Sequence, residues 1–333
     1  MMRVASSVVA CALVSGLVLA CGSSGGSSSS SSSGGAGAGG DGPVTDATLE
    51  AIGGAFCDRI KSCYGDFFVS TFIGDAATCK ARLSLELKGS AKGQGVQVKD
   101  SQAAACKTAV DGASCSTLLD DGVKECDFRG TLADGAACAN DSQCVSGACF
   151  VDPTTTCGKC GPRAAAGGDC TSAKCERGLA CSGAKKCVTL GADGATCDAT
   201  SAPCELGLTC IAGKCGKALA AGAACKNGMN ETPCDGFTGL FCKPPKATVP
   251  DGTCTMFTVA TVNELCGVTL QPTVDFSFCQ NSECIGATST TRGKCTAFLS
   301  DGAACDATKQ PDCQFPAKCR AGKCAVLDPT VCK

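Results

Sequence analysis

The chain has 333 residues, a formal net charge of −2, 34 cysteines and no histidine. The missing imidazole excludes Ser-His and Cys-His catalytic pairs and the commonest protein ligand of metal ions. The small net charge and the lack of a basic block argue against a nucleic-acid partner. We therefore expect no enzyme, no catalytic residues, no cofactor and no resident metal.

Residues 1–20 have the form of a signal peptide, with a short positive start and a modest apolar stretch. The stretch ends in Val18-Leu19-Ala20-Cys21, which resembles the bacterial lipobox. This resemblance implies that Cys21 is the lipidated first residue of the mature protein. Gly22 favours the outer membrane by analogy with lipoprotein sorting. We expect an exported lipoprotein of the bacterial cell envelope, and cleavage that leaves Cys21 unmodified is the alternative.

Residues 21–43 predict a tether, because Gly, Ser and Ala make up almost all of this segment. Such a composition buries too little surface to offset the entropy of ordering. As a coil it would reach roughly 25 Å, enough to lift a folded part off a membrane surface.

The cysteines indicate the fold class. Without Cys11 and Cys21, 32 cysteines remain, which is an even number. From Ala133 onward, about 16% of the residues are Leu, Ile, Val, Phe or Met, too few for an ordinary core. Disulfides made in an oxidising compartment would replace such a core. We expect small disulfide-rich repeats with short β-hairpins, preceded by a small disulfide-linked α-helical domain.

Residues 44–130 predict the helical domain. Thr45 and Asp46 can cap a helix in which apolar residues recur at spacings of three and four from Leu49 to Cys63, and Gly65 ends this helix. Further helical segments are predicted from near Asp75, at 100–110 and after Cys115, with a loop at 89–95.

Six cysteines lie in this helical region. Cys63 ends the first predicted helix and Cys79 begins the second, so an antiparallel helical hairpin would bring them together. We predict a Cys63–Cys79 bridge. The other four cysteines allow three pairings, and the sequence does not choose among them: Cys57, Cys106, Cys115 and Cys126.

Residues 131–333 consist of repeated units. Aligned on cysteine they form six units of four, named here repeats 1 to 6. The first cysteine follows a small turn such as Asp134-Gly135-Ala136-Ala137, and in four repeats the fourth follows Gly-Lys. The steps from a fourth cysteine to the next first cysteine are 10, 10, 10, 12 and 10 residues, a regularity that indicates a true repeat.

The third and fourth cysteines of a repeat flank a short turn, which predicts a small hairpin. A bond between these two would not connect the hairpin to the rest of the repeat, whereas one-to-three and two-to-four bridges would connect it. The predicted pairs are Cys138–Cys149 and Cys144–Cys160, Cys170–Cys181 and Cys175–Cys187, Cys197–Cys210 and Cys204–Cys215, Cys225–Cys242 and Cys234–Cys254, Cys266–Cys284 and Cys279–Cys295, and Cys305–Cys319 and Cys313–Cys324.

Two cysteines fall outside the repeats, and their partners are not predicted. Cys332 is interpreted as the start of a truncated seventh unit. Cys157 forms a C-x-x-C motif with Cys160. No thioredoxin-like pattern surrounds this motif, so structural bridging is expected rather than redox activity or metal binding.

This cysteine pattern resembles the Dickkopf N-terminal and prokineticin-type cysteine-rich modules, and similar repeats in secreted proteins of myxobacteria. The resemblance covers residues 131–333 and implies the same one-to-three and two-to-four pairing. Repeat 5 departs from the pattern, with twelve residues before its second cysteine and four before its third. The receptor binding of the animal proteins is not implied.

We expect a non-catalytic cell-surface protein for adhesion, recognition or envelope structure, held to the membrane by its lipid anchor and bound to an unidentified protein or glycan. A metal-sequestering cysteine array and a protease inhibitor are the alternatives. Each bridge contributes on the order of 3 kcal/mol, and a small domain has about 5–15 kcal/mol in total. Reduction is therefore predicted to unfold residues 131–333 completely.

Overall fold

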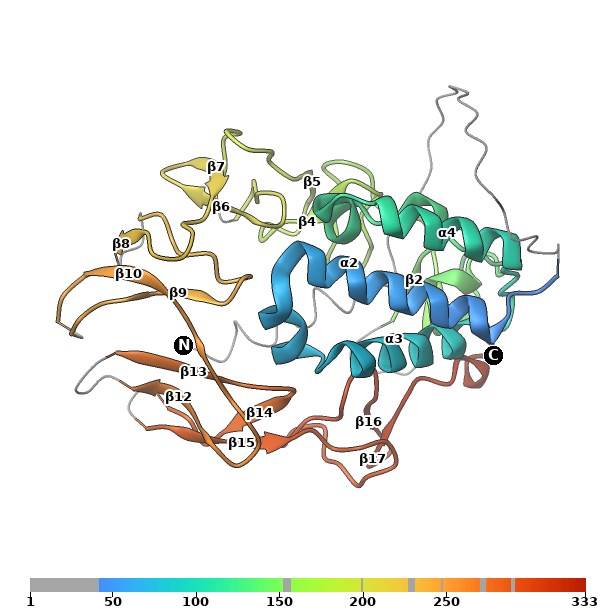
Figure 1. Ribbon diagram of the computed structural model, residues 1–333. Coiled ribbons are helices and arrows are strands. Elements are labelled where there is room, and N and C mark those ends of the chain that lie inside the picture. Colours follow the sequence, from blue (N-terminus) through green and yellow to red (C-terminus); the bar gives the residue numbers. More distant parts are fainter. Residues whose placement is uncertain are drawn as a thin grey trace. The chain divides into compact units, whose positions relative to one another are not determined.

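The computed structural model describes residues 42–151, 157–198, 200–226, 231–246, 248–269, 274–288 and 291–333. The predicted signal peptide, Cys21 and all but two residues of the predicted tether lie outside the described residues. Figure 1 shows three longer helices followed along the chain by a series of small sheets. The molecule thus has a disulfide-rich fold of small antiparallel strand pairs, with its helices toward the N-terminal side.

The four predicted helical segments are present, the first two extend beyond their predicted ends, and one further short helix was not predicted. The helices are α2 (Asp46–Phe72), α3 (Ala76–Ala91), α4 (Asp100–Gly112), the π-helix η1 (Thr117–Asp121) and the 3-10 helix η2 (Lys124–Cys126). The hydroxyl of Thr45 accepts a hydrogen bond from the amide of Thr48 at 3.2 Å, as an N-terminal cap does. Gly65 (φ 75°, ψ 179°) interrupts α2, and the helix resumes after it. The prediction that the helix ends at Gly65 therefore missed the segment that carries Phe67 and Phe68.

The described chain divides into two compact units. Unit A contains residues 42–59, 83–189 and 327–333, and unit B contains residues 60–82 and 190–326. Each unit combines part of the helical region with some of the repeats, so this division differs from the predicted boundary between residues 130 and 131. Whether residues 44–130 and 131–333 fold independently of each other stays a prediction.

In unit A, helical residues form a conventional apolar core. Leu49, Ile52 and Phe56 of α2 and Val110 of α4 are each at most 5% exposed. These positions recur at helical spacing, which places them on one face of each helix. The C-terminal part of unit A adds the 3-10 helix η4 (Pro329–Val331), whose Pro329 is buried.

Within the described residues, the repeats contain short strands in six separate sheets of two to five strands. In unit A they are β1 (Ala137–Cys138), β2 (Cys149–Phe150), β3 (Gly158–Cys160), β4 (Leu179–Cys181) and β5 (Cys187–Thr189). Repeat 1 also contains the 3-10 helix η3 (Asp141–Gln143). In unit B they are β6 (Leu208–Ile211), β7 (Lys214–Lys217), β8 (Ala224–Lys226), β9 (Leu240–Lys243), β10 (Asp251–Met256), β11 (Thr258–Ala260), β12 (Leu265–Thr269), β13 (Asp275–Cys279), β14 (Ser282–Ile285), β15 (Gly293–Ala297), β16 (Lys318–Arg320) and β17 (Lys323–Ala325).

All six repeats share one backbone scheme. The third residue before the first cysteine has φ between 76° and 87°, and its amide donates to the carbonyl of the fourth cysteine at 2.7–2.9 Å. The sixth residue before the first cysteine pairs in parallel with the second cysteine. Five repeats use glycine at the turn position, and repeat 5 uses Asn263 (φ 78°), a residue that tolerates this conformation. Repeat 5 therefore keeps the common structure although its spacing departs from the pattern.

Repeats 4 and 5 of unit B contain apolar packing that the sequence did not predict. Five rings, here called the aromatic cluster, come from α2 and from the region between β9 and β13: Phe67, Phe241, Phe257, Phe276 and Phe278. The ring centroids of Phe257 and Phe278 are 4.5 Å apart, and those of Phe241 and Phe257 are 5.1 Å apart. Phe67, itself 7% exposed, contacts both Phe257 and Phe278.

None of the helices in the described part of the chain combines the length and the apolar character that crossing a membrane requires.

Candidate functional site

The predicted bridges of the six repeats are all present. Each repeat joins its first cysteine to its third and its second to its fourth. The Cα–Cα distances are 5.7–5.9 Å for the first kind of bridge and 5.4–5.5 Å for the second. Such uniformity, repeat 5 included, indicates one module copied six times.

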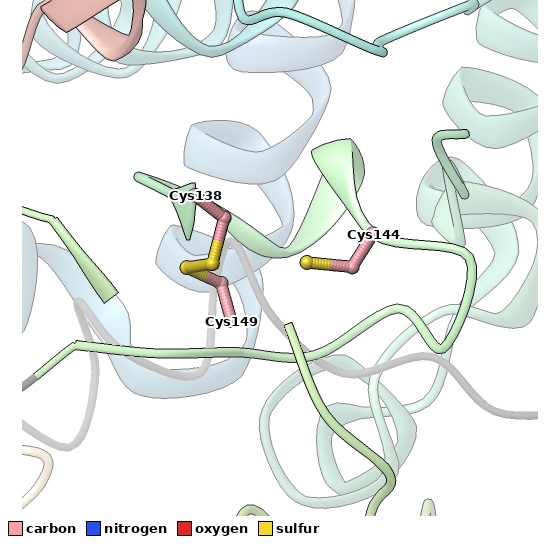
Figure 2. Close-up of side chains that lie close together, drawn as sticks. All are labelled: Cys138, Cys144 and Cys149. Atoms are coloured by element: carbon pink, nitrogen blue, oxygen red, sulfur yellow. A yellow bond between two sulfur atoms is a disulfide. The ribbon is translucent and has the colours of Figure 1, made fainter. Parts of the chain in front are cut away.

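The two bridges of a repeat lie side by side. Figure 2 shows Cys138 bonded to Cys149 in repeat 1, with the sulfur of Cys144 nearby. Cys144 is bonded to Cys160. The sulfurs of Cys138, Cys144 and Cys149 lie within 4.8 Å of one another, and together with Cys160 these residues form a buried cluster against which Leu132 packs.

Equivalent sulfur clusters occur in repeats 2 to 5 as well, and by distance alone they fit a thiolate metal site. A metal ligand must be a deprotonated thiolate, however. All 32 cysteines of residues 42–333 are disulfide-bonded. In this oxidised form the clusters are the small cores of the repeats, and only a reduced form could offer them to a metal ion.

Two bridges outside the repeats answer questions that the sequence left open. Cys106 of α4 is bonded to Cys126 of η2, and Cys157 is bonded to Cys332. The interpretation of Cys332 as the start of a seventh unit is wrong, because this residue returns to the C-x-x-C motif of repeat 1. Since 175 residues separate the two cysteines, no local spacing could have predicted this bond.

The C-x-x-C motif is structural. Cys157 and Cys160 belong to different bridges, to Cys332 and to Cys144 respectively, so the motif does not close on itself. Cys57, Cys63, Cys79 and Cys115 are also disulfide-bonded, and the Cys63–Cys79 pairing stays a prediction.

Unit A also contains a buried ionic cluster. Asp141 of η3, only 4% exposed, accepts hydrogen bonds from Lys174 Nζ and from the Cys149 amide, both at 2.7 Å. Arg163 lies 3.4 Å from the other carboxylate oxygen and donates to the carbonyls of Gly147 and Cys175. The cluster therefore connects repeat 1 to repeat 2.

Burial and ion pairing shift the pKa values of Asp141 and Lys174 in opposite directions. Burial raises the pKa of the Asp141 carboxyl, and the charges of Lys174 and Arg163 oppose that rise. Burial likewise lowers the pKa of Lys174, and Asp141 opposes that change. The sequence offered no signal for this role, because an aspartate at the start of a short turn usually bonds to nearby backbone.

Asp141 and Arg163 border a small cavity of about 60 Å³ that is otherwise lined largely by apolar residues such as Leu49, Ile52 and Phe56. Small-molecule sites usually measure about 300–1,000 Å³, so this space is suited to a few water molecules rather than a substrate.

Comparisons with protein-family models, with curated proteins and with solved structures found no match to this chain. The resemblance to Dickkopf-type modules consequently rests on the cysteine pattern alone.

Proposed function

We propose that this chain is a non-catalytic, lipid-anchored protein of a bacterial cell surface, whose repeats serve adhesion, recognition or envelope structure. The observation that carries the proposal is the bonding of all 32 cysteines in residues 42–333. Structural disulfides in this number persist in oxidising compartments outside the cytosol. Two bridges per module make small rigid units, which suit presentation of a surface better than a catalytic cycle that requires motion.

The anchor is the second part of the proposal. It is supported by Val18-Leu19-Ala20-Cys21 and by the Gly/Ser segment that follows. Mass spectrometry of the mature N-terminus from the native host is the test. The expected species begins at Cys21 and carries a diacylglycerol thioether, and a soluble form that begins elsewhere would refute the anchor. Protease treatment of intact cells then tells whether the repeats face outward.

We also propose that repeats 1 to 6 are related to the Dickkopf N-terminal and prokineticin-type modules. The shared one-to-three and two-to-four pairing supports this relationship. Disulfide mapping after proteolysis without reduction tests the pairing. Recovery of Cys210 linked to Cys215 would overturn it.

A metal-sequestering array is the second candidate, because the sulfurs of each cluster lie within 4.8 Å of one another. A thiol assay on protein purified without reductant separates the two functions. The proposed surface protein has almost no free thiol, and it binds no zinc until it is reduced. A metal array would show many free thiols after the metal is chelated.

A further inference from the structure

The basic and acidic residues of the repeats are segregated. Residues 131–333 contain eighteen of each. In each repeat, the strand that contains the third cysteine, the strand that contains the fourth and the turn between them are here called the hairpin. The six hairpins contain twelve of the basic residues but only three of the acidic ones. The hairpins comprise residues 149–160, 179–189, 208–217, 240–256, 282–297 and 318–325. Five of the six hairpins thus carry a net positive charge, and the hairpin of repeat 1 is neutral, although the repeat region as a whole is neutral.

One cross-strand pair in every hairpin contains a lysine. The residue after the third cysteine lies opposite the residue before the fourth, and this cross-strand pair contains Lys159, Lys186, Lys214, Lys294 or Lys323 in five repeats. These five lysines are all exposed. Among the described residues, no ion pair joins any of these five lysines to a carboxylate, although the charge of Lys186 contributes to lowering the pKa of Asp169.

Repeat 4 is informative because its sequence breaks the pattern. Thr253 stands before its fourth cysteine, but the residue opposite Thr253 is Lys243. The positive charge has moved to the other strand of the same cross-strand pair. Since neither position is required to be basic by the bridges or the turn, retention of the charge at the pair points to a function. Lys243 lies 3.5 Å from Asp275.

Repeat 6 contains the most strongly basic hairpin. Arg320 is directly opposite Lys323, and Lys318 lies two residues before Arg320, so all three cations share one face of β16 and β17. Like charges placed opposite each other destabilise a strand pair. The buried Nε of Arg320 has no hydrogen-bond partner in the described part of the chain. An anion bound at this face would offset the repulsion between the opposed cations, although the buried Nε itself is not accessible to it.

We propose that the six hairpins bind the carboxylate groups of an acidic polysaccharide, with one lysine per repeat at the contact and a second cation, Arg320, in repeat 6. The inference rests on the proposed surface function and names the class of its partner. A polymer that carries many carboxylates can offer one contact to each module, whichever unit the module belongs to. Nucleic acid fits less well, because single strands are held by stacking on aromatic side chains, and the residue opposite the lysine is aromatic only in repeat 1.

Two variants of the full chain with equal net charge test the proposal. The hairpin variant replaces Lys159, Lys186, Lys214, Lys243, Lys294 and Lys323 by Gln. The control variant replaces six exposed lysines outside the hairpins by Gln: Lys61, Lys80, Lys92, Lys124, Lys226 and Lys309. Binding to immobilised polygalacturonate is measured at physiological ionic strength, with neutral dextran and single-stranded DNA as comparison ligands.

The wild type is expected to bind polygalacturonate and not dextran, and to be released by salt. The hairpin variant is expected to lose about a hundredfold in affinity, as six exposed ion pairs together would provide, and the control variant less than about threefold. Equal losses in both variants, binding to DNA as tight as to polygalacturonate, or no binding by the wild type would each overturn the proposal.

A measurement on the wild-type protein tests the proposal even if the hairpin variant does not fold. Lysines are acetylated with and without polygalacturonate and quantified by mass spectrometry. The six hairpin lysines should be protected, and the six control lysines should not. Equal protection of both sets would overturn the proposal. The anchor at Cys21 is tested separately, by mass spectrometry of the mature N-terminus. A failure of polysaccharide binding can therefore be distinguished from a failure of the proposed surface location.

Discussion

Repeat 3 and repeat 4 have the same two bridges and the same turn hydrogen bonds, but they differ in what else they bury. Among the described residues of repeat 3, only Cys197 and Cys215 are buried. Repeat 4 buries Leu240 as well, and its Phe241 and Phe257 belong to the aromatic cluster with Phe67 of α2. Two bridges therefore suffice to shape a module, and apolar residues determine whether it also packs against a helix.

Complete reduction of the full chain should give the largest difference between these repeats. Loss of two bridges costs about 6 kcal/mol per repeat, comparable with the whole stability of a small domain. Among its described residues, repeat 3 buries only two of its bridge cysteines, so no apolar packing offsets that loss. Hydrogen exchange after reduction should show no protection at residues 208–217 and residual protection at β9, β10 and β13.

The composition alone predicted that reduction unfolds residues 131–333 completely. The structure limits complete loss of protection to repeats without apolar packing, such as repeat 3. The aromatic cluster supplies the burial that the average composition concealed. Uniform loss of protection across all six repeats would show that the cluster does not persist without its bridges. Residual protection in repeat 3 would contradict the account of that module.

The buried ionic cluster provides a third way to hold a module, in repeats 1 and 2. Asp141→Ala leaves Lys174 and the buried Arg163 without their carboxylate and should cost about 3–5 kcal/mol. Chemical denaturation with the disulfides intact measures this loss. Asp111→Ala breaks the exposed Lys107–Asp111 pair and should cost less than about 1 kcal/mol. Similar losses in the two variants would mean that burial adds nothing to the pairing of Asp141.

A pair of glycine substitutions isolates the aromatic contact. Gly207 and Gly239 both precede the leucine before the third cysteine, with φ of 90° and 86°. A Cβ at Gly239 would clash with the ring of Phe67, whereas a Cβ at Gly207 meets nothing within 4 Å. Both Ala variants share a backbone cost of about 1–2 kcal/mol.

Gly239→Ala should add about 1–3 kcal/mol for overpacking. The difference between the two variants is read from denaturation midpoints at equal slope. Equal destabilisation would show that the Phe67 ring moves aside freely and that packing of repeat 4 against α2 is loose.

Local patterns in the sequence predicted much of this structure. The helical spacing from Leu49 onward, the turn before each first cysteine and the register of the hairpins all depend on neighbours within about 20 residues. The twelve repeat bridges follow from these elements, because a repeated module restricts the pairings that are compatible with its hairpin.

Contacts between distant residues were not predictable in the same way. The Cys157–Cys332 bond joins residues 175 positions apart, and the aromatic cluster joins α2 to strands about 200 residues later. The phenylalanines of repeats 4 and 5 were visible in the sequence, but an average over residues 131–333 hid their concentration. The helix after Gly65 was missed because one interrupting glycine was interpreted as an end.

The smallest expected effect concerns repeat 6, which is held to α3 by charge rather than by rings. Arg82 donates two hydrogen bonds to Asp301, at 2.7 and 2.8 Å, and a third to the carbonyl of Gln314. The hydrogen bonds from Arg82 lower the pKa of Asp301. A carboxyl whose folded-state pKa lies below its unfolded value stabilises the fold above the ordinary pKa, and that stabilisation is lost as the pH falls through the folded value.

Because the Asp301 side chain is 41% exposed, the contribution should be below about 1 kcal/mol. Hydrogen-exchange protection of residues 299–326 should fall between pH 5 and pH 3 in the wild type, and this fall should be smaller in Asp301→Asn. Asp193→Asn changes the same turn position of repeat 3 and should leave the pH dependence of residues 299–326 as in the wild type. If Asp301→Asn retains the full pH dependence, other carboxylates are responsible, and repeat 6 is held against α3 mainly by the backbone carbonyls that Arg82 contacts.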